Sequence, residues 1–134
     1  MIELIVLDVD GTLTNGQITY TQNNIEIKSF DVKDGLAISV WNKKLNKKSA
    51  IITGRFSEIV EKRAKELGIT YLYQNIHNKD EILENILKKT KLTWKQVAVI
   101  GDDLNDLKML KKANISFCPN DAVELIKKNV NIVC

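Results

Sequence analysis

The sequence has few of the residues that form disulfide scaffolds or zinc and redox motifs. It contains two cysteines and one histidine among 134 residues. Cys118 and Cys134 lack the close spacing and the histidine partner that such motifs require. We interpret both as ordinary thiols of a reducing compartment, and we therefore expect a cytoplasmic protein.

Long apolar runs and dense basic runs are missing as well. No stretch approaches the roughly 18 apolar residues that a membrane-spanning helix needs. The amino terminus has no basic segment before its short apolar run, so we expect no signal peptide. The formal net charge is only +3, from 20 basic and 17 acidic residues. No basic run carries interleaved aromatic side chains, so we expect neither a membrane nor a nucleic acid as a partner.

The remaining composition is that of a globular domain. Hydrophobic residues make up 44% of the chain and charged residues 28%, values near the average for folded proteins. One domain takes roughly 100–200 residues, so we expect residues 1–134 to form a single domain. This length leaves no room for a separate lid domain over an active site. Any lid must be a short insertion or come from another subunit.

Short apolar runs alternate with amphipathic segments, a pattern typical of a parallel sheet with helices on its faces. We predict an α/β, Rossmann-like three-layer fold with a central, mainly parallel sheet. The expected strands are Glu3–Asp8, Ser49–Thr53, Thr70–Tyr73, Gln96–Gly101, Ile115–Cys118 and a short one at Asn131–Val133.

Each expected helix begins at a polar residue that can cap its amino end. Asn78 and Asp121 are each followed three positions later by glutamate, which completes a capping-box pattern. We expect the first helix over 35–45, the second to end at Gly68 and the third to reach about Lys89. The capping residues, in chain order, are Asp34, Ser57, Asn78, Asp103 and Asp121.

Residues 16–30 interrupt the alternation of strands and helices. Apolar residues alternate on both sides of a polar turn at 22–24, which predicts a β-hairpin inserted directly after the first strand. A two-stranded hairpin is marginally stable alone in water, so this one should pack against something.

Polar residues follow four of the strands at their carboxyl ends, where open α/β sheets bind ligands. Asp8 and Asp10 project the same way, and like charges this close need a cation between them. Gly11 allows a sharp turn there. A helix cap or Asx turn is the simpler interpretation of a single aspartate. A calcium loop is excluded, because Thr19 occupies the position of its bidentate glutamate.

The second and third positions suit an anion. Thr53 and Gly54 can offer O–H and N–H donors to a phosphate, although Thr-Gly is also common in turns. Lys79 falls at the first position of a helix, where the helix dipole disfavours a cation by up to about 1 kcal/mol. A bound anion would remove that objection, whereas a solvated surface lysine would tolerate it.

The fourth position, Gly101–Asp106, has three aspartates within five residues, more than helix capping requires. Asp103 can cap and Asp106 can favour the first turn. Asp102 is then left to bind a divalent cation, and Mg²⁺ typically takes one or two carboxylates. A hard cation beside anion donors indicates phosphoryl chemistry. Since the chain has no Ser/His pair, Asp8 is the candidate nucleophile.

The segments Asp8–Thr12, Thr53, Lys79 and Gly101–Asp106 resemble, in this order, the four motifs of haloacid dehalogenase-like (HAD) phosphohydrolases. The resemblance spans the whole chain, and the ordered set is highly specific although each motif is modest. Phe30–Gly35, Thr53–Arg55 and Tyr73–Lys79, together with the missing lid, are similar to the 3-deoxy-D-manno-octulosonate 8-phosphate (KDO 8-phosphate) phosphatases. This resemblance implies hydrolysis of KDO 8-phosphate in lipopolysaccharide precursor synthesis by a magnesium-dependent homotetramer. Its hairpins would form a β-barrel, and neighbouring subunits would help to close each active site.

The resemblance also implies a role for each site residue. Asp8 attacks phosphorus and becomes an aspartyl-phosphate. Asp10 protonates the leaving oxygen and then activates water, while its backbone carbonyl joins Asp8 and Asp102 in holding Mg²⁺. The groups implied to hold the phosphoryl oxygens are Thr53, the Gly54 amide and Lys79. Arg55 is a candidate for the carboxylate of the phosphorylated sugar acid, with a surface salt bridge as an equal alternative.

Other interpretations stay open at this point. Nonulosonate (sialic-acid-like) 9-phosphate phosphatases use a closely similar capless scaffold. A receiver domain of a two-component system shares an acidic pair, a phosphorylated aspartate, a threonine and a lysine, but in another chain order. A catalytically silent HAD subunit is a further alternative, against which intact Asp8 and Asp10 argue.

Family members usually continue past the last strand with a Gly-rich segment and a helix, whereas this sequence stops at Cys134. A truncated chain and a short variant are both open, and either one leaves substrate closure and turnover open.

Overall fold

The central sheet places β1 between two sets of strands. The computed structural model describes all of residues 1–134, and its six-stranded sheet has the order β5-β4-β1-β6-β7-β8. Every neighbouring pair is parallel. The predicted α/β fold with a mainly parallel sheet is therefore confirmed. The strands are β1 (Leu4–Leu7), β4 (Lys48–Ile52), β5 (Tyr71–Tyr73), β6 (Val97–Ile100), β7 (Ile115–Cys118) and β8 (Ile132–Val133).

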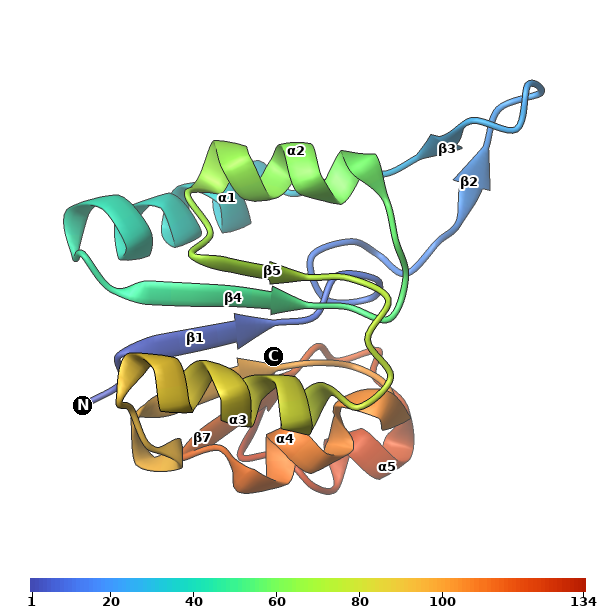
Figure 1. Cartoon of the computed structure of the whole chain (residues 1–134). Coiled ribbons are helices and arrows are strands. Elements are labelled where there is room, and N and C mark those ends of the chain that lie inside the picture. Colours follow the sequence, from blue (N-terminus) through green and yellow to red (C-terminus); the bar gives the residue numbers. More distant parts are fainter.

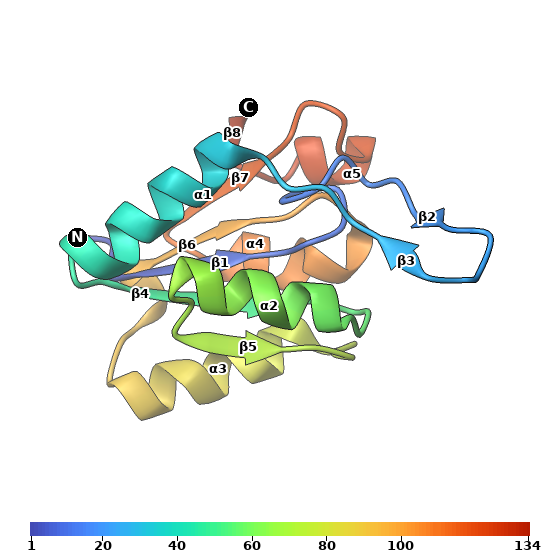
Figure 2. The same cartoon turned by 90° about the horizontal axis from the view of Figure 1, so that it is seen from above.

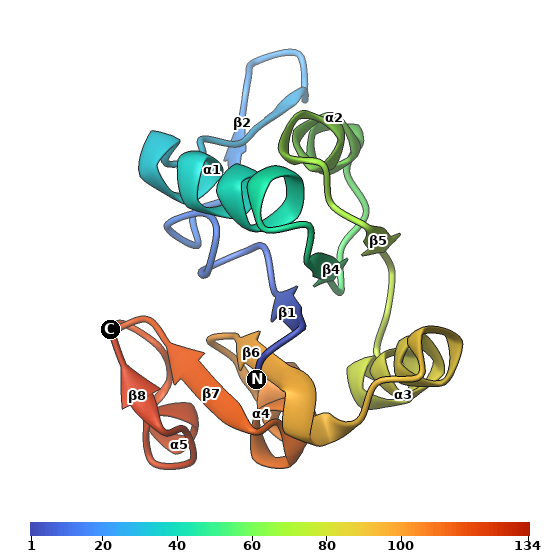
Figure 3. The same cartoon turned by 90° about the vertical axis from the view of Figure 1, so that its left-hand side faces the viewer.

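Helices cover both faces of this sheet (Figures 1 and 3). The helices α1 (Val32–Ser39) and α2 (Glu58–Leu67) lie on one face. The other face carries α3 (Lys79–Thr90), α4 (Leu107–Lys112) and α5 (Glu124–Lys127). Successive residues of a strand point to opposite faces, so Val6 packs in the larger core, toward α3, and Leu7 in the smaller core, toward α1 and α2. None of the helices is both long enough and apolar enough to cross a bilayer.

Two of the predicted caps form as expected. The Ser57 hydroxyl accepts a hydrogen bond from the Ile59 amide at the start of α2, and α2 ends before Gly68. Asp103 caps a short 3-10 turn, η3 (Leu104–Asp106), which leads into α4. Local sequence therefore fixes the amino ends of these two segments.

Three other capping predictions were wrong. Asp31, not Asp34, caps α1, because its backbone is extended and its carboxylate accepts from the Lys33 amide. The first helix also continues as a π-helical segment, η1 (Val40–Lys44). Asn78 precedes α3 without making a side-chain capping bond. Asp121 does not cap α5, because residues 119–122 form a turn closed by a backbone bond, and the helix begins at Glu124.

The predicted hairpin is present and projects past the carboxyl ends of β1 and β4 (Figures 1 and 2). Its strands, β2 (Thr19–Tyr20) and β3 (Glu26–Ile27), are antiparallel, and Asn24 turns between them with φ +62°. The expectation that it packs on something is not met within this chain, where its apolar side chains are 46–61% exposed. These side chains are Ile18, Tyr20, Ile25 and Ile27.

Candidate functional site

The candidate site lies at the carboxyl ends of β1, β4 and β6, beside the strand around which the chain order reverses. Open α/β sheets bind their ligands at such a point. A cavity of about 170 Å³ opens there. All predicted site residues line it except Lys79, which contacts Asp8. The lining residues are Asp8, Asp10, Thr53, Gly54, Arg55, Asp102, Asp103 and Asn105.

The loop after β1 brings the first acidic motif close to the last one. The amides of Thr12, Leu13 and Thr14 all lie within hydrogen-bond distance of the Val9 carbonyl, which forms a tight turn. Gly11 has φ +90°, and a Cβ built on it would lie 1.9 Å from Asp102 Oδ2. Only glycine fits this position, because any side chain would displace the Asp102 carboxylate.

Lys79 is buried between two carboxylates, which excludes the interpretation of a solvated surface lysine. Its Nζ lies 2.7 Å from Asp8 Oδ1 and 2.6 Å from Asp106 Oδ1, and its side chain is 0% exposed. Burial alone would lower the pKa of Lys79, but the two carboxylates outweigh burial and raise it. The ammonium therefore stays protonated and holds Asp8 in place.

Asp106 is a residue whose role sequence reasoning missed. It was expected only to favour the first turn of a helix, yet it is fully buried. Its Oδ1 accepts from Lys79, and its Oδ2 accepts from the amides of Asp102 and Asp103 at 3.1 and 3.3 Å. The sequence did offer one signal for this role, because the segment 101–106 contains three aspartates and Asp106 is the third.

Asp102 has the properties of a cation ligand. Its buried Oδ1 accepts no hydrogen bond, and carboxylate oxygens of Asp8, Asp102 and Asp106 lie within 4.8 Å of one another. Burial, the hydrogen bond with Asp8 and the surrounding negative charges raise the pKa of Asp102 to about 8. These hard oxygen donors fit Mg²⁺. Since both Asp106 oxygens are already bonded, Asp8 and Asp102 are the carboxylates free to bind it.

Asp10 lines the same cavity as Asp8 and Asp102, and it also contacts a residue of the hairpin segment. Its Oδ1 lies 2.5 Å from Lys28 Nζ, and that ammonium also lies 2.9 Å from Glu26 Oε1. Burial opposes protonation of Lys28, but its bonds to Asp10 and Glu26 prevail and raise its pKa. Sequence reasoning missed Lys28 and Glu26, although their alternation with Ile25 and Ile27 placed them on one polar face.

The predicted anion donors surround the same cavity. Thr53 is 2% exposed, and the Gly54 amide donates to no group of this chain. The Arg55 guanidinium lies 3.4 Å from Glu26 Oε1, with 41% of its side chain exposed. Arg55 therefore makes the salt bridge of the simpler interpretation and also reaches the edge of the cavity.

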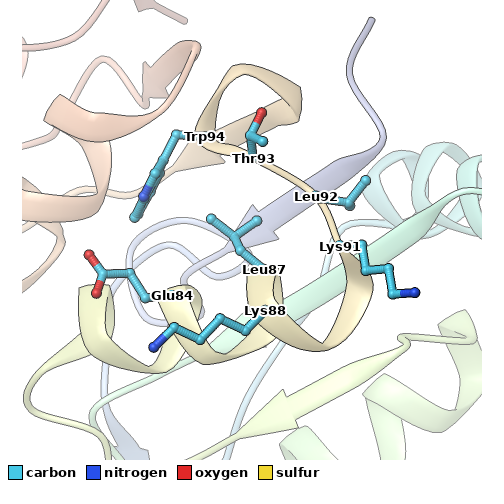
Figure 4. A pocket seen from close by; sticks show the side chains of 7 residues that line it. All are labelled: Glu84, Leu87, Lys88, Lys91, Leu92, Thr93 and Trp94. Atoms are coloured by element: carbon cyan, nitrogen blue, oxygen red, sulfur yellow. The ribbon is translucent and has the colours of Figure 1, made fainter.

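A larger hollow, of about 460 Å³, lies elsewhere, between α3 and the 3-10 turn η2 (Trp94–Gln96). Figure 4 shows Trp94 across from the α3 side chains, with Lys88 and Lys91 pointing in different directions. No cluster of polar groups converges there, so the chemistry of the chain gathers in the smaller cavity. Its lining residues are Glu84, Leu87, Lys88, Lys91, Leu92, Thr93 and Trp94.

Comparisons with known proteins show which family and which structures this chain is similar to. Residues 29–134 match a family described as haloacid dehalogenase-like hydrolase. The 3-deoxy-D-manno-octulosonate 8-phosphate phosphatase of Escherichia coli K12 is 40% identical over 125 residues, which are 93% of this chain. The chain spans 66% of the length of that relative.

Two solved structures have similar folds. One is the 3-deoxy-D-manno-octulosonate 8-phosphate phosphatase of Moraxella catarrhalis in complex with magnesium, phosphate and KDO. The TM-score is 0.95 at 38% identity, and the matched region covers 99% of this chain and 76% of the Moraxella catarrhalis chain. The other is the cobalt-bound deoxy-D-mannose-octulosonate 8-phosphate phosphatase of Haemophilus influenzae. Its TM-score is 0.91 at 36% identity, and the matched region covers 98% of this chain and 77% of the Haemophilus influenzae chain.

Proposed function

This chain belongs to the haloacid dehalogenase-like hydrolases, and from that membership we propose that it hydrolyses phosphate monoesters with Asp8 as the nucleophile. One observation carries the proposal. The Asp8 carboxylate lines the cavity between a buried ammonium, Lys79, and an unpartnered carboxylate oxygen of Asp102. A charged group held in this way suits attack on a phosphoryl group, where catalysis is mainly positioning and charge neutralisation.

The proposal gives each site residue a defined role. Asp8 forms the aspartyl-phosphate, Asp10 gives a proton to the leaving oxygen, and Asp10 then takes a proton from the attacking water. Lys79 holds Asp8 and offers its charge to the phosphoryl oxygens. Mg²⁺, held by Asp8, Asp102 and the Asp10 carbonyl, would neutralise phosphoryl charge. The remaining donors proposed for the phosphoryl oxygens are the Thr53 hydroxyl and the Gly54 amide.

We propose KDO 8-phosphate as the substrate and KDO plus phosphate as the products. The related enzymes named above support this substrate, and Arg55 offers a guanidinium at the cavity edge for the carboxylate of a sugar acid. We also propose that residues 1–134 act as one capless domain of a cytoplasmic homotetramer. The exposed apolar hairpin supports that assembly, in which neighbouring subunits would complete the closure of each site.

Phosphate release with Mg²⁺ from KDO 8-phosphate, a nonulosonate 9-phosphate and p-nitrophenyl phosphate tests the function. We expect kcat/KM to be highest for KDO 8-phosphate and Asp8→Asn to reduce release to background. Asp121→Asn, the same change at an exposed residue outside the site, should keep full activity. A preference for the nonulosonate 9-phosphate would overturn the substrate. Stable phosphorylation by acetyl phosphate without turnover would instead favour a receiver domain.

A further inference from the structure

Lys28 reaches the candidate site from the hairpin and makes contacts that the proposed reaction has not used. Its ammonium contacts Asp10 at 2.5 Å and Glu26 at 2.9 Å, and its side chain is 1% exposed. A lysine buried to this extent between two carboxylates is uncommon at the base of an otherwise exposed hairpin. Lys28 therefore contacts Asp10, the residue proposed to act first as the acid and then as the base, and it can affect both proton transfers.

Lys28 occupies only one of the two oxygens of Asp10. Oδ1 accepts its hydrogen bond, whereas Oδ2 accepts none from this chain. Asp10 also lines the cavity that holds Asp8. Fixing Oδ1 limits the rotation of the carboxyl group, so that Oδ2 keeps one orientation for proton transfer. Misplacement of a reacting group by about 1 Å can cost on the order of 100-fold in rate.

Glu26 balances the charge of Lys28 while Asp10 changes its own. Asp10 is neutral when it carries the proton and negative after it has given the proton away. A buried ammonium paired only with Asp10 would lose its partner in the neutral state, which is costly. Glu26 remains beside Lys28 in both states and also lies 3.4 Å from Arg55.

We propose that Lys28 is a positioning residue for Asp10, fixing Oδ1 so that Oδ2 carries the proton in both steps; this rests on the proposed function. In the first step the Asp8–phosphorus bond forms, the bond to the leaving oxygen breaks, and Oδ2 gives its proton to that oxygen. In the second step water attacks phosphorus, the Asp8–phosphorus bond breaks, and Oδ2 takes a proton from the water. The sum is ester plus water giving alcohol plus phosphate.

The leaving group distinguishes this role from a merely structural one. A sugar alkoxide needs a proton to leave, whereas p-nitrophenolate leaves without one. We expect Lys28→Gln to lower kcat/KM about 30-fold or more for the sugar phosphate and less than about 3-fold for p-nitrophenyl phosphate. Lys33→Gln makes the same charge change at a side chain that is 88% exposed, and it should alter neither value.

Two further variants keep the test decisive if Lys28→Gln folds poorly in thermal melting. Glu26→Gln should show the same selective loss for the sugar phosphate, because it removes the second carboxylate that holds the Lys28 ammonium against Asp10. In an Asp10→Asn background, Lys28→Gln should change kcat/KM less than about 2-fold, since residues that act as a unit are not additive.

The outcomes separate this inference from the function it rests on. If the wild-type chain releases phosphate from neither substrate, or if Asp8→Asn retains turnover, the proposed function fails. If the wild type hydrolyses both substrates and Lys28→Gln lowers both equally, or neither, only the role of Lys28 is overturned. An unchanged Mg²⁺-induced shift in melting temperature in Lys28→Gln would support action through Asp10, whereas a lost shift would contradict it.

Discussion

The charge of Lys79 allows the carboxylates of Asp8, Asp102 and Asp106 to lie within 4.8 Å of one another. The Lys79 Nζ lies 2.7 Å from Asp8 and 2.6 Å from Asp106, whereas the buried Oδ1 of Asp102 has no hydrogen-bond partner in this chain. The charges of Asp8, Asp106 and Asp103 contribute to raising the pKa of Asp102, after burial. One ammonium does not neutralise three carboxylates, so a bound divalent ion would stabilise the charged form of the site.

Replacing this lysine tests the arrangement. Lys79→Met keeps the length of the side chain but leaves Asp8 and Asp106 as buried charges without their partner. Breaking a buried pair in this way costs about 3–5 kcal/mol of the free energy of unfolding. We also expect phosphate release to fall on the order of 100-fold or more. Urea unfolding and a phosphate assay measure both, and Lys88→Met, on the exposed face of the same helix, should change neither. Unaltered unfolding would contradict the buried pair.

The raised pKa of Asp102 predicts an unusual pH dependence. Without metal, Asp102 keeps its proton in the folded state between about pH 4 and pH 8, whereas in the unfolded state it has lost it. The stability of the metal-free chain should therefore fall as pH rises through this window. Mg²⁺ competes with that proton, so the stabilisation by Mg²⁺ should grow with pH.

Thermal melting with Mg²⁺ and with a chelator, at several pH values in that window, measures this linkage. Asp102→Asn carries no charge to titrate, so it should abolish the growth of the Mg²⁺ effect. A Mg²⁺ shift in the wild-type chain that stays constant with pH would refute the linkage.

At the level of elements, the strands were predictable because each carries its own signal. Buried on both faces, Leu4–Leu7 and Val97–Ile100 are continuous apolar runs. The helix caps were less predictable, because neighbouring acceptors compete. Asp31 and Asp34 are both suitable caps, and only the extended backbone at Asp31 decides between them.

The site was predictable where the fold brings strand ends together. Parallel strands put Asp8, Thr53 and Asp102 at one edge of the sheet. The ion pairs of Lys79 with Asp106 and of Lys28 with Asp10 join residues 27 and 18 positions apart, respectively. Such pairings depend on how α3 and the hairpin are placed, and no local pattern encodes them.

The loop after β1 offers a matched pair of glycines. Both Gly11 and Gly16 have positive φ, +90° and +86°, so alanine is strained at either position by about 1–3 kcal/mol. A Cβ at Gly16 meets nothing closer than 3.5 Å, whereas one at Gly11 collides with the Asp102 carboxylate. We therefore expect Gly11→Ala to weaken Mg²⁺ binding by about 10-fold or more, and Gly16→Ala to leave it unchanged.

Titration of the Mg²⁺-dependent melting shift compares the two variants. Equal Mg²⁺ affinities in Gly11→Ala and Gly16→Ala would contradict the placement of Asp102 against this loop. Weaker binding in Gly11→Ala only, with similar loss of stability in both, would support it.

For the whole molecule, the hairpin links assembly to chemistry. Ile25 and Ile27 lie on one side of its second strand and are 61% and 46% exposed, while Glu26 and Lys28 alternate with them and face the site. Exposed apolar side chains of this kind favour association, since burying one stabilises by about 1.5–3 kcal/mol. An assembly formed on the apolar side would hold the strand that presents Lys28 to Asp10.

This arrangement predicts the behaviour of a chain that cannot assemble. We expect the wild type to have the mass of a tetramer in light scattering and Ile25→Asp to have that of a monomer of 15.2 kDa. Leu45→Asp, a similar change at a side chain that is 55% exposed outside the hairpin, should leave the assembly intact. Because monomeric Ile25→Asp would hold Lys28 loosely, its kcat/KM should fall more for a sugar phosphate than for p-nitrophenyl phosphate. A monomeric wild type at assay concentration would refute the assembly, and an equal fall for both substrates would show that the hairpin serves assembly without positioning Asp10.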